Sequence, residues 1–507
     1  MSESGIAVIG AGVGGLAAAI DLAAQGHEVQ VIERASSPGG KLRQVRIGDS
    51  LLDAGPTVFT MRWVFDEIFE RAGTRLDAEL PLTPLEILAR HAWSDDERLD
   101  LFADRAQSAA AIGELCGAAE ARRFLDFSAT AERTYRTLES TYIRAARPSP
   151  IDVARRAGVG ELWRTRPCAT LWHALGTHFR DARLQQRFGR YATYCGSSPF
   201  LAPATLALIA HVEQAGVWLP AGGMHALALA MARVAGGLGV TFRYGCVATR
   251  ILVEHGRVRG VELDNGERVG ARAVVFNGDV AALGRGLLGE HAVRAVPASR
   301  PAARSLSALT WNLVTTTDGF PLHRHNVFFS GDYAAEFDDL FRRGRLPRSA
   351  TVYVCAQDRG EGVPTGPERL LCLVNAPPVG DVRPLEPAEI EQCEQQSWGL
   401  MTRCGLRLDP PGRTAVVTTP SAFERLFPAT GGALYGQASH GWRTSFTRPG
   451  ARTALPGLYL AGGSTHPGAG VPMATLSGRN AAASLLADLG STSRSPRVAT
   501  HGGISTR

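Results

Sequence analysis

The sequence predicts an α/β protein whose centre is a Rossmann-type nucleotide-binding domain assembled from separate stretches of the chain. An apolar strand at 6–9 runs into a glycine-rich turn and then a helix, the usual opening of such a domain. A second strand at 457–463, near the other end, leads into a helix over 473–489. Between them, 60–220 is mostly helical and 305–447 is β-rich, which predicts a helical lid lobe and an α+β substrate domain.

The glycine-rich turn has the spacing Gly10-x-Gly12-x-x-Gly15, which brings backbone N–H groups and a helix N-terminus against a pyrophosphate. A following strand, 28–32, ends at Glu33, where a carboxylate can accept hydrogen bonds from the ribose hydroxyls of an adenosine. An acid at this position favours FAD or NAD over NADP, because it would repel the 2′-phosphate.

The residues after Glu33 favour FAD over NAD. A nicotinamide domain would continue with further βαβ units, whereas here Gly39-Gly40-Lys41 follows at once and the segment closes on Asp53-Ala54-Gly55-Pro56-Thr57. Such segments resemble the two-dinucleotide-domain flavoproteins, in which the chain returns along the flavin. The late helix N-terminus after Gly468-Ala469-Gly470 suits the flavin or its ribityl chain. The predicted flavin-binding residues are Gly10, Gly12, Gly14, Gly15, Glu33, Gly40, Lys41, Gly55, Pro56, Thr57, Val247, Gly462, Gly463, Val471, Pro472 and Met473.

Lys41 is the only lysine among the 54 lysine and arginine residues. The preference for arginine over lysine mostly reflects codon composition. A lysine that is kept beside a glycine pair therefore indicates a specific function at that position. We predict that it places a compact cation near the FAD diphosphate or the flavin ring. The alternative is that Lys41 lies on a turn by chance and has no specific function.

Composition excludes several classes of protein. The 8 cysteines are scattered without metal-ligand spacing, which predicts isolated core thiols in a reducing cytosol and no metal site. The net charge of +6 comes without an aromatic-interleaved basic array, so nucleic acid is not an expected partner. Uncharged runs stay short of the ~20 residues of a membrane-spanning helix, so any membrane contact should be peripheral.

A basic stretch between Tyr142 and Arg166 suggests where that contact lies. Six arginines (Arg144, Arg147, Arg155, Arg156, Arg164 and Arg166) face only Asp152 and Glu161, with Ile143, Ile151, Val153, Leu162 and Trp163 interspersed. This composition suits an anionic membrane surface. A solvated, arginine-rich helix pair is the alternative. The expected location is cytoplasmic, peripherally associated with the inner or photosynthetic membrane.

The length of 507 residues requires two or three intertwined lobes. The predicted division is a discontinuous FAD-binding domain at 1–90, 220–290 and 450–490, a helical, membrane-facing lid at 91–219, a β-rich substrate domain at 291–449 and a disordered tail at 491–507.

Three segments resemble the bacterial carotenoid desaturase family, FAD enzymes related in fold to phytoene desaturase and the amine oxidases. Residues 53–62, 187–194 and 466–479 are most similar to its 1-hydroxycarotenoid 3,4-desaturases, also called methoxyneurosporene dehydrogenases. Phytoene desaturases share His-Pro-Gly-Ala-Gly but usually continue with Ile-Pro-Gly and a Ser-Ala-Lys stretch. Here Val471-Pro472-Met473 and Ser477-Gly478-Arg479 stand instead. The resemblance covers nearly the whole chain and implies FAD and a hydrophobic carotenoid substrate.

The chemistry that this resemblance implies is desaturation of a 1-hydroxycarotenoid at C3–C4. Hydride loss from C4 to flavin N5 leaves a cation delocalised along the polyene, and proton loss from C3 completes the double bond. Little acid–base assistance is needed, so positioning should supply most of the rate. His466 is a candidate catalytic neighbour of the flavin, with a structural role as its alternative; no catalytic base and no electron acceptor are assigned.

Other functions remain open on the sequence. Phytoene or neurosporene desaturation is the first alternative, and carotene isomerisation would use the same scaffold without net oxidation. An amine oxidase is disfavoured because no aromatic-lined amine site can be located. A lipid-binding protein like the GDP dissociation inhibitors would use this fold without flavin, which the intact glycine motif and Glu33 argue against.

Overall fold

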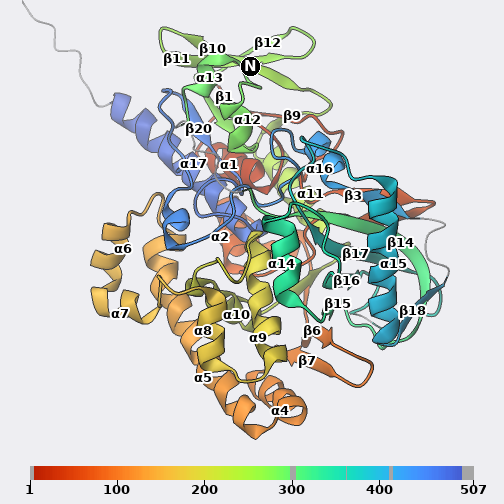
Figure 1. Ribbon diagram of the computed structural model, residues 1–507. Helices are drawn as coiled ribbons and strands as arrows, with labels where there is room; N and C mark the ends of the chain where they lie inside the picture. The colour runs from red at the N-terminus through yellow and green to blue at the C-terminus, as the bar shows by residue number, and fades with distance from the viewer. Residues whose placement is uncertain (1–4, 297–303, 361, 363, 410–414, 494–507) are drawn as a thin grey trace, which may run out of the picture.

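The computed structural model describes residues 5–296, 304–360, 362, 364–409 and 415–493. It contains a parallel sheet with its helices, a larger sheet that is antiparallel except for one strand pair, and a lobe of helices (Figure 1). The two sheets lie side by side, and the helical lobe lies below both in this view. Segments from both ends of the chain meet in the parallel sheet, as the sequence predicts for a Rossmann-type fold.

The parallel sheet has five strands in the order β20-β13-β1-β2-β9. Its strands are β1 (Ile6–Ile9), β2 (Val29–Ile32), β9 (Thr241–Arg243), β13 (Ala273–Phe276) and β20 (Leu458–Leu460). Alternate residues serve the two faces: Val8 and Val31 pack against helices, whereas Ala7 and Val274 pack against a small antiparallel sheet. The helices are α1 (Val13–Ala23), α2 (Trp63–Arg71), α11 (Met224–Gly237) and α17 (Val471–Ser493), and the small sheet is β10 (Ala248–Glu254), β11 (Arg257–Leu263) and β12 (Arg268–Gly270).

Helices α1 and α17 pack unusually closely because each carries a glycine at the crossing. A Cβ atom at Gly478 would collide with the backbone oxygen of Gly14, and one at Gly14 would lie 2.8 Å from the backbone oxygen of Ala474. The two helix N-termini predicted to hold the cofactor are thereby brought together. Helix α17 continues to Ser493, so residues 491–493 are helical rather than part of a disordered tail, and 494–507 lie outside the described residues.

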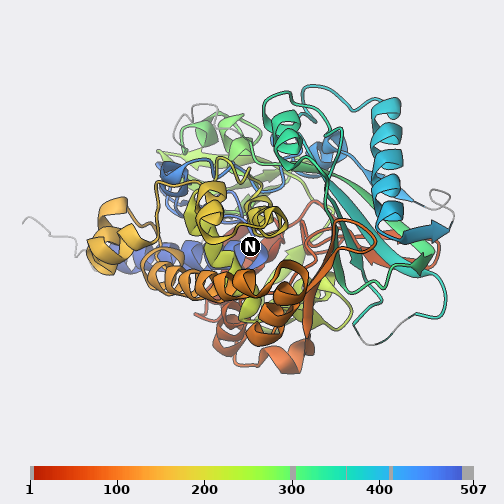
Figure 2. The same cartoon turned by 60° about the horizontal axis from the view of Figure 1, so that its bottom comes forward.

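The larger sheet has eight strands, seven of them in the order β18-β14-β17-β16-β15-β6-β7, with β19 also paired to β14. The strands are β6 (Ile87–Ala92), β7 (Arg98–Phe102), β14 (Ser307–Gly319), β15 (His325–Phe328), β16 (Val352–Ala356), β17 (Glu368–Ala376), β18 (Leu406–Asp409) and β19 (Val416–Thr418). Figures 1 and 2 show helix α15 (Pro387–Arg403) lying along its outer face. Trp311, Val354 and Cys372 point toward α15, whereas Thr310, Tyr353 and Leu373, each the neighbour of one of these, line a cavity on the opposite face.

Strands β6 and β7 correct the predicted division of the chain. The boundary at residues 90 and 91 cuts through β6, and β7 belongs to the antiparallel sheet instead of the helical lobe. The two strands form a hairpin around the polar turn 94–97, and β6 joins the sheet by parallel pairing with β15, more than 200 residues away. Local sequence carries no sign of so distant a partner.

The helical lobe begins with two consecutive helices that meet at a glycine. Gly117, at φ +90°, ends one helix and starts the next. Its helices are α4 (Arg105–Cys116), α5 (Ala118–Leu138), η1 (Glu139–Ile143), α6 (Pro150–Ala157), α7 (Val159–Arg164), α8 (Leu171–His178), α9 (Ala182–Gly189), η2 (Arg190–Cys195), η3 (Ala204–Ala207) and α10 (Leu208–Gln214).

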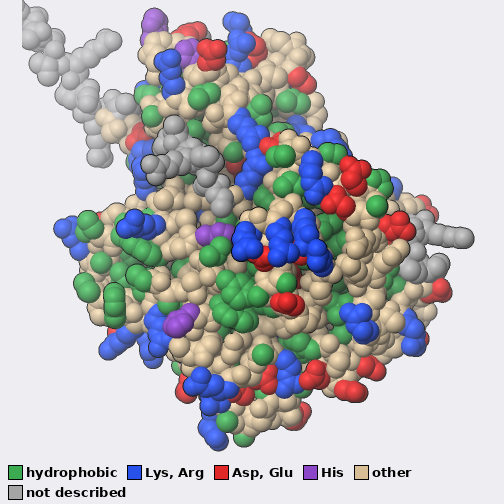
Figure 3. Space-filling view, viewed as in Figure 1, with side chains coloured by type: hydrophobic (Ala, Val, Ile, Leu, Met, Phe, Trp, Pro, Cys, Tyr) green, Lys and Arg blue, Asp and Glu red, His purple; other side chains and the backbone are tan. Residues whose placement is uncertain are grey.

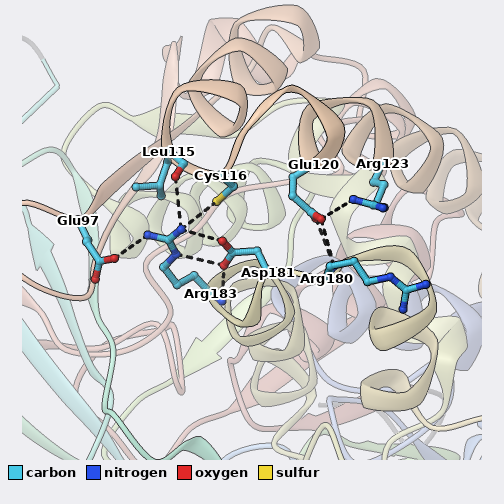
Figure 4. Close-up of polar contacts among 8 residues, drawn as sticks. All are labelled: Glu97, Leu115, Cys116, Glu120, Arg123, Arg180, Asp181 and Arg183. Carbon is cyan, nitrogen blue, oxygen red and sulfur yellow. Dashed lines mark hydrogen bonds and ion pairs between the residues drawn. The ribbon is translucent and has the colours of Figure 1, made fainter.

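A cluster of polar contacts fixes the start of α9, the helix that leads into η2. Arg183 donates hydrogen bonds to Asp181 Oδ2 (2.7 Å), to Glu97 Oε1 in the β6–β7 turn (2.6 Å) and to the carbonyl of Leu115 at the end of α4 (3.3 Å) (Figure 4). Burial, reinforced by Asp181, raises the pKa of the neighbouring Cys116 thiol to about 12, so this sulfur stays protonated. The cluster therefore ties the antiparallel sheet, α4 and α9 together.

The remaining elements connect these parts. They are α3 (Leu76–Glu79), α12 (Val280–Gly284), α13 (Glu290–Val293), α14 (Tyr333–Phe341), α16 (Pro420–Leu426) and η4 (Trp442–Phe446), with the strand pairs β3 (Gln44–Ile47) and β4 (Ser50–Asp53), and β5 (Leu82–Pro84) and β8 (Trp218–Pro220).

Candidate active site

A single cavity of about 1130 Å³ is lined by the glycine loop, by the antiparallel sheet and by the helical lobe. Every residue predicted to bind the flavin lines it except Gly15. The structure thus brings together side chains and loops that lie more than 400 positions apart in the sequence. The cavity has a part walled by glycines and charged groups and a part walled by apolar side chains.

The glycine loop has the form that a diphosphate requires. Gly10 adopts φ +98°, and Gly12 begins α1 without any side-chain hydrogen bond to the first-turn N–H groups. Gly15 has a packing role, since a Cβ there would collide with the backbone oxygen of Gly10. Asn277, which the sequence reading did not single out, donates from Nδ2 to the carbonyls of Gly10 (3.2 Å) and Gly12 (3.4 Å) and holds the loop open.

Glu33 stands at the end of β2 and is only 6 % exposed. Its Oε2 accepts a hydrogen bond from the N–H of Ala11 (2.7 Å), and its Oε1 accepts one from the N–H of Ala35 (2.8 Å). Each oxygen keeps a further lone pair toward the cavity, which both Glu33 and Val247 line. The carboxylate is therefore fixed where an adenosine ribose is expected, and the glycines and acid fit FAD.

A second group of backbone carbonyls is organised by Arg448, which the sequence reading also missed. Its guanidinium donates to the carbonyls of Gly463 (3.0 Å), Gln437 (2.7 Å) and Tyr435 (3.2 Å), and burial lowers the pKa of the side chain. Gly462, at φ +106°, closes β20 beside Asn277. These contacts hold the loop between β20 and α17 against the cavity.

Lys41 lines the same cavity, as expected of a residue near the cofactor. Its Nζ donates to the carbonyl of Leu434 (2.6 Å) and lies 5.3 Å from the centre of the Phe427 ring. Burial lowers the pKa of Lys41, while Asp279 opposes that shift and Arg448 adds to it. The only lysine is thus a partly buried group of the cavity wall and does not lie on a fully exposed turn.

The segment 53–57 is held from both sides. Asp53 accepts hydrogen bonds from the N–H groups of Met224 (2.5 Å) and His225 (3.3 Å) at the start of α11, and its own N–H donates to Gln357 Oε1 (2.9 Å). Thr57 Oγ1 and the Tyr353 hydroxyl share a hydrogen bond of 2.7 Å. Tyr353 thus connects the predicted flavin segment to the antiparallel sheet.

The apolar part of the cavity contains one buried ion pair in its wall. Glu213 Oε2 accepts hydrogen bonds from Arg187 Nη2 (2.9 Å) and the Tyr191 hydroxyl (2.6 Å), and its Oε1 accepts one from the Tyr194 hydroxyl (2.9 Å). Around this cluster the lining is apolar, with Leu206, Leu208, Ile209, Val212, Leu371 and Leu373 among its residues.

His466 does not line the cavity, so its candidacy as a catalytic neighbour of the flavin stays an untested prediction and its contacts favour the structural alternative. Its Nε2 lies 2.7 Å from the carbonyl oxygen of Ala145 and 3.1 Å from that of Tyr142, and its side chain is buried. Two carbonyl acceptors require Nε2 to carry a proton. Burial lowers the pKa of His466, so the ring is a neutral donor that joins the β20–α17 loop to η1.

The missed residues differ in how well sequence could have found them. Asn277 directly follows a parallel strand, at the edge where such sheets bind ligands, so its polar side chain was a usable signal. Arg448, Gln357 and Glu213 reach the site from distant segments without a local motif, and only the tertiary fold reveals them.

Comparisons with known proteins agree with this geometry. Residues 13–486 match the family of flavin containing amine oxidoreductases. The hydroxyneurosporene desaturase of Rubrivivax gelatinosus is 56 % identical over 99 % of this chain and 97 % of its own length. The enzyme of the same name from Cereibacter sphaeroides is 48 % identical, covering 96 % of this chain and 99 % of the relative. The phytoene desaturase of Neurospora crassa is 30 % identical over 92 % of this chain and 82 % of its own.

Solved structures share the fold at low identity. Putrescine oxidase bound to putrescine is 14 % identical with a TM-score of 0.59, covering 96 % of this chain and 99 % of that one. Cyclohexylamine oxidase from Brevibacterium oxydans is 15 % identical with a TM-score of 0.56, covering 96 % and 100 %. The predicted α/β flavoprotein fold, the FAD cofactor and the resemblance to carotenoid desaturases are confirmed by these relatives. The chain belongs to the flavin containing amine oxidoreductase family and is an FAD-dependent oxidoreductase.

Proposed function

We propose that this enzyme desaturates a 1-hydroxycarotenoid at the C3–C4 bond. The observation that carries the proposal is the continuity of the glycine-walled and apolar parts of one cavity, because a long hydrocarbon can lie in the second while its end reaches the first. Near-complete relatives named hydroxyneurosporene desaturase support the substrate class. Desaturation of phytoene or neurosporene is the alternative, and it has support from a more distant relative.

The residues proposed to hold FAD are those of the glycine loop and the loops facing it. The Gly10–Gly14 backbone would receive the diphosphate, Glu33 the ribose, and Lys41 with the 55–57 segment the flavin end. Bound FAD supplies an acceptor for two electrons and a proton, that is, a hydride.

The protein side of the reaction is mainly positioning and exclusion of water. Apolar side chains from η3, α10 and the inner face of the antiparallel sheet line the part of the cavity proposed to hold the polyene. The positive charge that develops on hydride loss spreads along the conjugated chain and needs no single counter-ion. Orientation of this kind can supply several orders of magnitude in rate.

The test is anaerobic reduction of the flavoenzyme by carotenes with and without the 1-hydroxyl group, followed by product identification. The proposal expects flavin bleaching and a product lighter by two hydrogens with the hydroxylated carotene. Bleaching by the non-hydroxylated carotene alone would favour the phytoene or neurosporene alternative. An unchanged mass with altered double-bond geometry would indicate isomerisation.

We also propose that α6 and α7 form a membrane-docking patch at the mouth of the cavity. Ile151, Val159 and Trp163 are 63 %, 74 % and 73 % exposed, and Figure 3 shows the apolar surface over these helices with cationic side chains at its edge. Val159 and Trp163 also line the cavity, so it opens within this patch. No helix in the described ranges is long and apolar enough to cross a membrane.

Only some of the six arginines are suited to face lipid. Arg144 forms ion pairs with Glu67 (2.8 Å) and Glu139 (3.0 Å), and Arg164 pairs with Glu161. Arg155 and Arg156, on α6, are exposed beside Ile151. An anionic surface would attract such cations with about 1 kcal/mol each.

The docking test compares two charge reversals of equal size on exposed arginines of the same lobe. Arg155→Glu with Arg156→Glu should weaken cosedimentation with vesicles containing anionic lipid, while Arg122→Glu with Arg133→Glu on α5 should leave it unchanged. Flavin content should remain that of the parent in both. Equal binding of the two variants would overturn the proposed patch.

A further inference from the structure

Arg190, the first residue of η2, places a guanidinium in the cavity wall without a polar partner. The residue is 7 % exposed and lines the cavity. Its Nε is enclosed without a hydrogen-bond partner, and within the described ranges its guanidinium forms neither a hydrogen bond nor an ion pair. Its Cζ lies over the face of the Tyr353 ring, 5.5 Å from the ring centre.

Among the described residues, neither neighbouring acid forms an ion pair or a hydrogen bond with Arg190. Glu213 is already paired with Arg187 and accepts hydrogen bonds from two tyrosine hydroxyls. Glu336 is buried, and Thr351 and Asn375 donate to its oxygens. Burial raises the pKa of Glu336, and the hydrogen bonds from Thr351 and Asn375 and the charge of Arg190 act against that shift. Arg190 therefore remains a buried donor with unused hydrogen-bonding capacity.

A buried guanidinium without a hydrogen-bond partner destabilises the ligand-free protein, and a ligand that accepts its hydrogen bonds would explain why it is there. A guanidinium has five N–H donors and no acceptor, so the ligand group must supply an oxygen lone pair. Burying such a group without partners is unfavourable. The nearby polar groups Glu213 and Tyr194 are hydrogen-bonded to each other, and much of the remaining lining is apolar. The matching ligand is a long apolar molecule with one oxygen near the place where Arg190 stands.

Arg190 lies near the segment proposed to face the flavin, and the substrate hydroxyl lies near the bond proposed to react. Arg190 lies over the ring of Tyr353, whose hydroxyl contacts Thr57 in the segment proposed to face the flavin. In a 1-hydroxycarotenoid only three carbon–carbon bonds separate the hydroxyl-bearing C1 from C4. The oxygen and the reacting carbon must therefore lie close together, at the flavin end of the cavity.

We propose that Arg190 donates a hydrogen bond to the 1-hydroxyl oxygen of the substrate and so determines which bond of the polyene is presented for oxidation. This inference rests on the proposed function. Apolar walls allow a uniform polyene to slide lengthwise, whereas one directional contact at its end fixes the register. A site built around a substrate hydroxyl also discriminates against the analogue that lacks it, because its buried donor is then left unpaired.

The test uses Arg190→Met, Arg190→Lys and, as a matched control, Arg187→Met. The control removes an equally buried arginine three positions earlier, one that has an internal acidic partner. Each variant is assayed for flavin content, melting temperature, and kcat and KM with a 1-hydroxycarotene and with the carotene of equal length lacking the hydroxyl. Binding of both carotenes to the oxidised enzyme is measured by quenching of tryptophan fluorescence.

The expected result separates anchoring from a structural role. Arg190→Met should keep its flavin and a melting temperature at least equal to the parent's, yet lose roughly 10- to 100-fold of the preference for the hydroxylated carotene, mainly through KM. Arg190→Lys should retain part of the preference, because it retains a charged donor. Arg187→Met should lower the melting temperature instead.

Two outcomes would overturn the anchor: an undiminished preference for the hydroxylated carotene in Arg190→Met, or an equal loss for both carotenes together with a lower melting temperature. A parent enzyme that desaturates both carotenes equally well would overturn the anchor and leave carotenoid desaturation standing. A parent that oxidises neither would overturn the proposed function, and the binding titration would then decide the role of Arg190 alone.

Discussion

Removal of the Glu213 carboxylate is the sharpest test of how the wall of the cavity is stabilised. Glu213 on α10 joins α9 and η2 to α10, through Arg187, Tyr191 and Tyr194. We expect Glu213→Leu to destabilise the helical lobe strongly, although leucine fills a similar volume in an apolar setting.

The magnitude follows from what the substitution leaves behind. Arg187, 1 % exposed, would become a buried charge without its partner, which costs about 3–5 kcal/mol. The buried Tyr191 hydroxyl would lose its acceptor, at about 1–3 kcal/mol. Together, roughly 4–8 kcal/mol is comparable with the whole stability of a typical domain. The double variant Arg187→Met, Glu213→Leu buries no charge and should recover most of the loss.

The assay is thermal unfolding at one scan rate, followed by near-ultraviolet circular dichroism and by fluorescence of released flavin, for the parent, both single variants and the double variant. Both single variants should melt well below the parent, and the double variant should melt above either. Strictly additive losses in the double variant would refute the ion pair as the source of the effect.

Three further expectations follow from the site and its surroundings. Gly478→Ala should separate α17 from α1 at the Gly14 backbone and lower bound flavin, and Glu33→Ala should do so by removing the ribose acceptor; full flavin occupancy in both would contradict the cofactor assignment. Lys41→Met should lower flavin affinity or its midpoint potential, with Lys41→Arg milder, and a Met variant identical to the parent in both measurements would return Lys41 to an incidental role. Burial lowers the pKa of His440 from 6.5 to about 4, so its contribution to stability is complete above pH 6.5 and is lost as the pH falls toward 4; His440→Gln should flatten the fall of the melting temperature over this range, and an unchanged slope would exclude it.

The nucleotide-binding part was predicted well because its binding residues lie in short, contiguous sequence motifs. The predicted strand 6–9 coincides with β1, and the predicted strand 28–32 differs from β2 only at its first residue. The predicted helix after the glycine-rich turn is α1, which begins at Val13 with Gly12 as its N-cap. Fifteen of the sixteen proposed flavin residues reach the cavity, although their contacts with FAD remain a prediction.

The substrate half was less predictable, for a physical reason. Its wall is built by pairings such as β15 with β6 and by contacts such as Arg187 with Glu213, which depend on tertiary packing. Segment 187–194 stood out only through its family resemblance. Its sequence does not distinguish Arg187, which forms an ion pair, from Arg190, which forms none within the part of the chain that the structure describes. The different surroundings of Arg187 and Arg190 emerge only when α10 is packed against them.

Side chains on a strand of the antiparallel sheet point alternately toward α15 and toward the cavity. This alternation separates the residues that stabilise the fold from those that shape the substrate site. On β17, Cys372 and Val374 pack toward α15, whereas Leu371, Leu373 and Asn375 face the cavity. Substitutions at the cavity-facing positions can reshape the space for a polyene while the α15-facing core keeps its packing. Single substitutions at every second residue can thus adapt the cavity to a longer, shorter or bent substrate. The alternate residues of the strand stabilise the fold.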